Sequence, residues 1–153
     1  MKLSVAIASE KALPSAFVVF RGFKESIQKA AMLGYDGVEL ALKSADEINP
    51  STLEKLLKTC NLEVSCISTG QVFADLGLMF TDSNPEKRKS VKKVFTELID
   101  LAEDFGHMVN IGRVRGKIGN NRQQAESLFI ELAGELCDYA AGKNVTLLLE
   151  PVN

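Results

Sequence analysis

Short apolar segments alternate along the chain with longer amphipathic segments. Five of the apolar segments have the length and composition of strands: Leu3–Ala8, Gly37–Leu42, Glu63–Ser68, Met108–Gly112 and Val145–Glu150. The last contains the run Val-Thr-Leu-Leu-Leu, and such continuous apolar runs are typical of strands covered on both faces in parallel sheets. We therefore expect five strands, with the fifth buried along its length.

The segments between these strands carry helix start and stop signals. Asn49-Pro50 and Asn84-Pro85 each place an N-cap residue before a proline at the first helical position. Ser90–Phe105 and Gln123–Ala141 each carry an apolar stripe at helical spacing, which predicts a core-facing helix. Residues that tolerate the left-handed backbone of a helix end stand just before the strands: Gly34, Asn61, Gly106 and Gly142 (or Asn144).

Strict alternation of strands and helices predicts an α/β fold with parallel strands and right-handed crossovers. Two architectures fit over residues 1–153, taken as a single domain: an open doubly wound sheet, or a partial (β/α)8 TIM barrel of about five strands and four helices. The longest irregular stretches are Ser9–Arg21, Thr69–Asn84 and Arg113–Asn121. All three follow the carboxyl end of a strand, where ligands bind in either architecture.

The fifth strand lies close to the last residue of the sequence. A central strand with no helix after it leaves one face and one edge uncovered. A (β/α)8 barrel takes roughly 250 residues, and five strands within residues 1–153 suit the N-terminal part of one. We expect a fragment of a longer barrel, and an open five-stranded domain that stops by design is the alternative.

Composition narrows the classes of partner. Lys and Arg number 18 against 20 Asp and Glu, for a formal net charge of −2, which favours neither nucleic acid nor an anionic membrane. No apolar run approaches the roughly 20 residues of a membrane span, and the N-terminus lacks a signal-peptide pattern, so we expect a cytoplasmic protein. The three cysteines, Cys60, Cys66 and Cys137, have no CxxC spacing, which argues against a zinc ribbon or a disulfide framework.

Two glutamates lie within or at the tip of apolar strand segments. Glu150 stands at the carboxyl tip of the fifth strand, where a carboxylate can bind a divalent ion and take a proton from a carbon beside a carbonyl. A solvated loop acid or a structural salt bridge is the alternative for this residue. Glu39 interrupts Gly37–Leu40 and should point into the barrel. There it would accept hydrogen bonds from substrate hydroxyls, or pair with an Arg or Lys.

Polar residues after the third and fourth strands suit a hydroxylated or anionic ligand. Arg113 and Arg115 stand among glycines and favour a phosphate or carboxylate, with a solvated basic loop as the alternative. Thr69 and Gln71 offer a hydroxyl and an amide, although turns use the same residue types. His107, the only histidine, opens the fourth strand at the opposite end, so we expect a stability or surface role and no His-based catalytic triad.

Three stretches of the chain resemble a known family. They are Ala30–Leu40 (AAMLGYDGVEL), Ile111–Gly116 (IGRVRG) and Leu147–Asn153 (LLLEPVN). They resemble the sugar phosphate isomerase/epimerase family of the xylose-isomerase-like TIM barrel superfamily, which also holds endonuclease IV. The resemblance spans essentially the whole chain and about the first half to three-fifths of such a barrel.

The resemblance implies a role for Glu150. In that family the glutamate that closes strand five binds a divalent metal ion (Mn²⁺, Mg²⁺ or Co²⁺), and in the epimerases it also transfers protons. The family's other metal ligands, an Asp, a His and a second Glu on strands six to eight, have no counterpart here. The metal site is thus incomplete in this chain, and we expect at most weak metal binding and no turnover by residues 1–153 alone.

Three hypotheses follow from these patterns. The leading one is a metal-dependent isomerase or epimerase acting on a ketose, sugar phosphate or related polyol through an enediolate, with Glu150 as the catalytic residue. The substrate contacts expected for it are Glu39, Thr69, Gln71, Arg113 and Arg115. The second is a non-catalytic half-barrel that forms a homo-oligomer, or pairs with another chain, through its open edge. The third is an endonuclease IV-like phosphodiesterase, which the acidic balance and the lack of early histidines disfavour.

Overall fold

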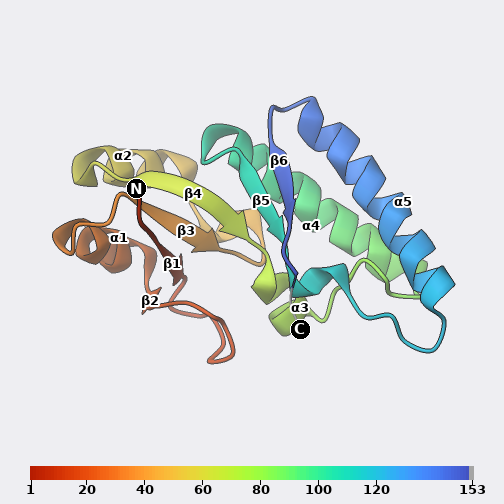
Figure 1. Ribbon diagram of the computed structural model, residues 1–153. Helices are drawn as coiled ribbons and strands as arrows, with labels where there is room; N and C mark the ends of the chain where they lie inside the picture. The colour runs from red at the N-terminus through yellow and green to blue at the C-terminus, as the bar shows by residue number, and fades with distance from the viewer. Residues whose placement is uncertain (152–153) are drawn as a thin grey trace.

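The computed structural model in Figure 1 describes residues 1–151 and contains one sheet of parallel strands with helices along one face. The strands are β1 Ser4–Ala8, β2 Phe20–Arg21, β3 Gly37–Ala41, β4 Glu63–Ser68, β5 Met108–Ile111 and β6 Thr146–Leu149. Their order is β2-β1-β3-β4-β5-β6, and every neighbouring pair is parallel. Apart from β2, the strands follow one another in space as they do in sequence. That order is typical of a (β/α) barrel, because a doubly wound sheet reverses it at a switch point. The partial TIM barrel is confirmed.

The helices begin and end largely where the sequence signals them. They are α1 Phe23–Met32, α2 Pro50–Cys60, α3 Gly70–Leu76, α4 Pro85–Asp104 and α5 Arg122–Ala141. The Asn49 side chain accepts from the Thr52 N–H and caps α2, and the Asn84 side chain accepts from the Glu86 N–H and caps α4. After α5, Asn144 rather than Gly142 adopts the left-handed conformation, with φ 54°. Within residues 1–151, no helix combines the length and apolarity that crossing a membrane requires.

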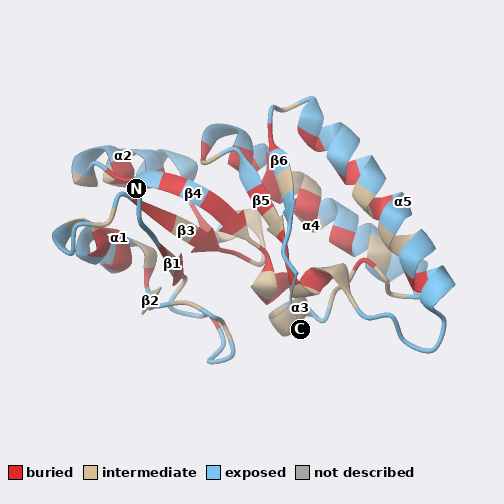
Figure 2. Cartoon of the chain, viewed as in Figure 1, coloured by how far each residue is buried: buried red, intermediate tan, exposed pale blue. Residues whose placement is uncertain are grey.

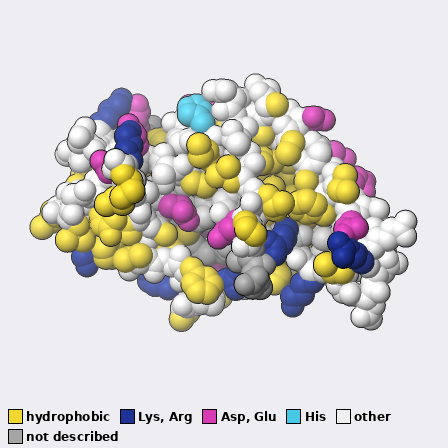
Figure 3. All heavy atoms as spheres, in the orientation of Figure 1, with side chains coloured by type: hydrophobic (Ala, Val, Ile, Leu, Met, Phe, Trp, Pro, Cys, Tyr) yellow, Lys and Arg dark blue, Asp and Glu magenta, His cyan; other side chains and the backbone are white. Residues whose placement is uncertain are grey.

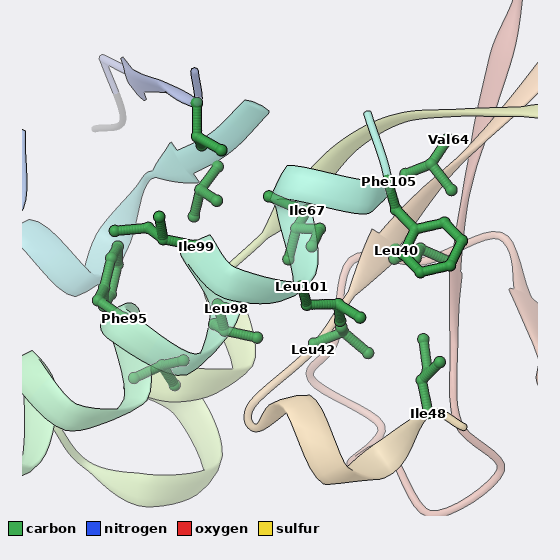
Figure 4. Packing of buried hydrophobic residues seen from close by; sticks show 14 of the residues in the cluster. Leu40, Leu42, Ile48, Val64, Ile67, Phe95, Leu98, Ile99, Leu101 and Phe105 are labelled. Atoms are coloured by element: carbon green, nitrogen blue, oxygen red, sulfur yellow. The ribbon is translucent and has the colours of Figure 1, made fainter. Parts of the chain in front are cut away.

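Side chains alternate along each strand, so the sheet has one face toward the helices and one face away from them. Val38 and Leu40 are fully buried against the helices, whereas Glu39 between them is only half-buried. Helix α4 supplies much of the facing core: in Figure 4, Leu98 and Leu101 of α4, and Phe105 directly after it, lie near residues of β3 and β4. Figure 2 shows buried residues within the strands and on the helix surfaces turned to them. The core therefore lies between the helices and one face of the sheet.

Three stretches expected to be irregular contain short regular elements. Ser9–Arg21 ends in β2, which pairs with the last two residues of β1, and Thr69–Asn84 contains α3. In the third stretch, Arg113–Arg115 forms a 3₁₀ helix, η2. Another short 3₁₀ helix, η1, spans Ala45–Glu47, outside these stretches. The sequence hides α3 because it begins at a glycine and has no side-chain cap, and β2 because it is two residues long.

The expectation that the fifth apolar segment is buried along its length is wrong. In β6, Leu148 is 39% exposed and Leu149 is 59% exposed. The physical reason is position: β6 is the last strand in the sheet order, so one edge and its inner face have no neighbour among residues 1–151.

We predict that Phe95→Ala destabilises the fold strongly. The Phe95 ring is fully buried in α4 and meets the Phe80 ring edge-on, with ring centroids 4.9 Å apart. Removing it should lower the free energy of unfolding by about 3–5 kcal/mol, measured by urea denaturation followed by circular dichroism. Ile130→Ala on the outer side of α5, where the side chain is 68% exposed, should stay within about 0.5 kcal/mol of wild type. Equal effects of the two substitutions would contradict this assignment of the core.

Candidate active site

The face of the sheet turned away from the helices carries the polar chemistry. In Figure 3 acidic side chains lie near the centre of the face turned to the viewer, with basic side chains below and beside them. Strand pairing orders these residues: Glu39 on β3 is opposite Cys66 on β4, and Ser68 at the end of β4 is opposite Asn110 on β5. Glu150 follows β6, and its N–H donates to the Ile111 carbonyl at 3.1 Å. The carboxyl ends of β4, β5 and β6 therefore meet at one edge.

Glu150 is held at two points. The Asn110 side-chain amide donates from Nδ2 to Glu150 Oε2 at 3.0 Å, and Arg115 Nη1 donates to the Glu150 main-chain carbonyl at 2.6 Å. The other carboxylate oxygen, Oε1, accepts no hydrogen bond from residues 1–151. One oxygen is thus oriented by the protein, and the second is left for a ligand or a proton.

Gly112 makes room for this carboxylate. A Cβ at Gly112 would lie 2.9 Å from Glu150 Oε2 and 3.2 Å from Asn110 Oδ1, closer than such atoms approach without displacement. Glycine leaves the space that this contact requires, because the Glu150 carboxylate lies directly against the backbone where β5 ends.

Cys66 lies within electrostatic range of both glutamates. Burial, and after it the negative charge of Glu39, raises the pKa of the Cys66 thiol to about 12. The charge of Glu150 adds to this rise, while a hydrogen bond with the Asn110 backbone opposes it. The thiol is therefore protonated at neutral pH and is a poor nucleophile. Its position indicates that the strands bring Glu39 and Glu150 to the same region.

Glu39 is a half-buried acid on the inner face. Its carboxylate forms no ion pair and no hydrogen bond with the part of the chain that the structure describes, so the alternative of a structural ion pair with Arg or Lys finds no support there. A half-buried carboxylate without a partner is costly, and it suits a ligand that brings hydrogen-bond donors. Its role as a substrate ligand stays a prediction.

Thr69 and Gln71 brace the loop after β4. The Thr69 hydroxyl donates to the Asn110 carbonyl at 2.6 Å, and Gln71 Nε2 donates to the Ala41 carbonyl at 2.6 Å. Both residues are buried, and Gln71 Oε1 is a buried acceptor without a partner among the described atoms. These bonds tie the start of α3 to β5 and β3. Their roles as substrate contacts stay predictions.

Arg113 lies in η2, directly after Gly112. Its guanidinium carbon is 5.1 Å from the ring centroid of Phe17, in the loop between β1 and β2, and 6.0 Å from that of Phe73 in α3. Arg113 and Arg115 are thus neighbours in sequence with different contacts: the first meets aromatic rings, and the second holds the Glu150 main chain.

A surface depression of about 910 Å³ lies at the opposite end of the strands. His107 lines it, together with the ion pair between Lys2 and Glu63. It is remote from Glu150, because His107 precedes β5 whereas Glu150 follows the end of β6.

No group of three or more His, Cys, Asp and Glu side chains is arranged to hold a metal ion among the residues described. At the sheet edge, the Glu150 carboxylate offers a suitable oxygen ligand for a hard divalent cation, but one carboxylate does not make a site. The described residues fit part of a metal site at most.

A family model described as xylose isomerase-like TIM barrel matches residues 27–153. The chain belongs to this family. The match includes all three stretches that carry the resemblance. Of the last stretch, Val152 and Asn153 lie outside the described residues.

Solved structures give the same fold for this xylose-isomerase-like chain. A D-allulose 3-epimerase from Methylomonas sp., in complex with D-allulose, has 21% identity and a TM-score of 0.72, with 100% of this chain and 53% of that chain covered. An AP endonuclease of family 2 from Brucella melitensis has 21% identity and a TM-score of 0.73, with 100% and 56% covered. A 3-keto-D-glucoside 4-epimerase from E. coli has 15% identity and a TM-score of 0.72, with 99% and 57% covered.

At these identities the similarity shows the fold. The chain spans little more than half the length of each of these three proteins. A comparison with curated protein sequences gives no match.

Sequence reasoning missed Asn110, Gly112 and Cys66 as parts of the site. The sequence carried a signal for the first two. Asn110 is a polar residue inside an apolar strand, and Gly112, two residues later, falls on the same face of that strand. Cys66 gave no such signal, since a free cysteine is a common buried residue.

We predict that neutralising Glu39 makes the Cys66 thiol more reactive. In a Cys60→Ser/Cys137→Ser background, Glu39→Gln should lower the pKa of Cys66 below its value of about 12, because the carboxylate charge that disfavours the thiolate is removed. The rate of iodoacetamide labelling at a fixed alkaline pH should rise several-fold.

Glu63→Gln is the matched control, since Glu63 begins the same strand but is exposed and paired with Lys2. Labelling that is unchanged by Glu39→Gln, or changed equally by both substitutions, would show that the Glu39 charge does not reach Cys66.

Proposed function

We propose that the intact protein is a sugar isomerase or epimerase that removes a proton from a substrate carbon beside a carbonyl. The observation that carries this proposal is the Glu150 carboxylate at the carboxyl edge of the barrel strands, with Oε2 fixed by Asn110. In (β/α) barrels this edge is where catalytic residues gather. The sugar epimerases among the proteins of the same fold support the proposal without deciding the substrate.

Glu150 acts as the base in this proposal. Its Oε1 takes the proton, the electron pair of the C–H bond forms the carbon–carbon double bond, and the carbonyl oxygen becomes the enediolate oxygen. Return of the proton to the former carbonyl carbon, with the hydroxyl proton on the deprotonated carbon passed to the former carbonyl oxygen, gives the isomer. Delivery of a proton to the opposite face of the deprotonated carbon gives the epimer. Epimerisation needs a second acid on that opposite face. The family resemblance predicts such a group on a later strand.

A divalent metal ion, when bound, would hold adjacent substrate oxygens and stabilise the charge of the enediolate. The Glu150 carboxylate is the ligand that this chain would supply, through the second lone pair of Oε2, while Oε1 takes the proton. The Asn110 amide and the Arg115 contact keep the carboxylate in one position, so that less order has to be gained when a ligand arrives. The other ligands would come from outside residues 1–151.

Substrate contacts are proposed on the same face. Glu39 would accept hydrogen bonds from sugar hydroxyls, and Gln71 Oε1 is a further unpaired acceptor near the start of α3. Thr69 would act mainly by holding the Asn110 strand in place, because its hydroxyl donates to the Asn110 carbonyl.

A second proposal concerns association through the open edge of the sheet. Leu148 and Leu149 of β6 are partly exposed, and the outer backbone groups of that strand have no pairing strand among the described residues. Exposed strand edges of this kind favour pairing with another segment or chain. Further barrel strands, or a second copy in a homo-oligomer, would bury these leucines.

We predict that Glu150→Gln strongly reduces turnover by the intact protein. The amide is nearly isosteric but cannot accept the proton, so kcat/KM for interconversion of ketoses should fall roughly 10²- to 10⁴-fold. The measurement is product formation from a panel of ketoses and ketose phosphates in the presence of Mn²⁺, Mg²⁺ or Co²⁺. Glu63→Gln, at the other end of the sheet, should stay within about twofold of wild type. Retention of near wild-type kcat/KM by Glu150→Gln would remove Glu150 from the mechanism.

We also predict that Gly112→Ala reduces activity by moving the base. The added methyl would lie 2.9 Å from Glu150 Oε2, so the carboxylate has to shift. A displacement of this order should lower kcat roughly 10- to 100-fold. Gly134→Ala in α5, where a Cβ meets nothing within 4 Å, is the control and should leave kcat unchanged. Wild-type kcat in Gly112→Ala would mean that this contact does not position the base.

A further inference from the structure

Arg113 is a half-buried cation whose charge is met by aromatic rings and not by an acid. Its guanidinium carbon lies 5.1 Å from the Phe17 ring centroid and 6.0 Å from the Phe73 centroid. Its side chain forms no ion pair and donates no hydrogen bond to any residue of 1–151. A guanidinium carries five N–H donors, and leaving them unused in a half-buried place is unfavourable.

The other cations of the chain are mostly engaged differently. Lys43 pairs with Asp75, and Arg122 pairs with Glu126. Arg21, Arg88 and Arg115 each donate to a main-chain carbonyl. Arg113 thus combines partial burial with donors that the described protein does not use.

The aromatic contacts leave those donors available. A cation–π contact uses the face of the planar guanidinium, whereas its N–H groups radiate in the plane. Phe17 comes from the loop after β1 and Phe73 from α3, so two separate segments hold the arginine at the carboxyl end of the sheet. Phe17 is itself 85% exposed, which leaves this end of the site open to a ligand.

The position of Arg113 links it to the proposed base. It follows Gly112, whose backbone lies against the Glu150 carboxylate, and Arg115 two residues later holds the Glu150 carbonyl. The carboxylates of Glu39 and Glu150 make the centre of the face unfavourable for an anion, whereas Arg113 offers a local cation beside it. A ligand with a neutral reactive end and an anionic far end matches this distribution of charge.

We propose that Arg113 binds an anionic group of the substrate, a phosphate or a carboxylate, at the end of the sugar remote from the carbon that Glu150 deprotonates. This inference rests on the proposed function and narrows its substrate class from ketoses in general to sugar phosphates or sugar acids. A guanidinium binds the oxyanions of both groups in a bidentate manner, so both share the chemistry that Arg113 recognises.

The test compares three probes that share one sugar scaffold. Binding of D-fructose, D-fructose 6-phosphate and D-fructuronate to the intact protein is measured by isothermal titration calorimetry at constant ionic strength. At least one anionic probe should bind more tightly than D-fructose. Arg113→Gln should raise the Kd of that anionic probe roughly 10- to 100-fold and leave the Kd of D-fructose within about twofold of its wild-type value.

Two further variants separate recognition from folding. Lys117→Gln removes an exposed cation from the same loop and should leave all three Kd values unchanged. Arg113→Lys keeps the charge but loses the planar pair of donors, so it should retain part of the preference for the anion. If Arg113 had a purely structural role, Arg113→Gln would raise the Kd of all three probes by a similar factor. That result would overturn the proposal.

The outcomes also separate this inference from the proposed function. A preference for the phosphate or for the carboxylate, lost in Arg113→Gln, identifies the substrate as a sugar phosphate or a sugar acid. Failure of both anions to bind more tightly than D-fructose, or a preference that survives in Arg113→Gln, overturns the proposal. If D-fructose is nevertheless turned over in a Glu150-dependent way, the proposed function stands without the anion site.

Discussion

The two faces of each parallel strand are the constraint on which the rest of this structure depends. Side chains alternate along a strand, so a strand covered by helices on one side presents its other side to the interior of the barrel. In β3 this places Val38 and Leu40 in the core and Glu39 on the opposite face. In β5, Val109 and Ile111 are buried, whereas Asn110 between them reaches Glu150. The same alternation that builds the core therefore collects the polar groups.

Close packing at the edge of the sheet turns that collection into a defined geometry. Gly112 lets the Glu150 carboxylate lie against the end of β5, and Asn110 and Arg115 fix the carboxylate and its main chain. Thr69 and Gln71 tie the segment after β4 to the neighbouring strands, and Arg113 packs against Phe17 of the loop between β1 and β2. Glu150 is thus oriented by hydrogen bonds from two residues of the preceding βα unit.

Much of the fold follows from the sequence because the signals are local. Asn49 and Asn84 before prolines, together with Asn61 and Gly106 before strands, predicted helix boundaries that the structure confirms. Helix α3 was missed because a glycine start without a side-chain cap carries no local signal. The exposure of β6 was missed because an apolar sequence indicates that a strand favours burial. It does not indicate whether a neighbouring strand is present to bury it.

The candidate site was less predictable than the fold. Glu150 and Glu39 could be found because acids are unusual in apolar strands, and Arg113 because glycines surround it after a strand. The Asn110 contact and the packing of Gly112 depend on which strands are neighbours and in what register. The contact of Arg113 with Phe17 joins residues that are far apart in the sequence. No local sequence pattern encodes such a long-range contact.

The central claim is that the carboxyl edge of this sheet removes a proton from a carbon next to a carbonyl. Solvent deuterium incorporation tests it most directly: the intact protein with Mn²⁺ and a panel of ketoses and ketose phosphates is incubated in D₂O and followed by ¹H NMR. The account predicts loss of the signal of a proton on a carbon beside the carbonyl in at least one of these sugars, faster than without protein. No exchange with any sugar of the panel, together with cleavage of abasic-site DNA by the same preparation, would contradict it.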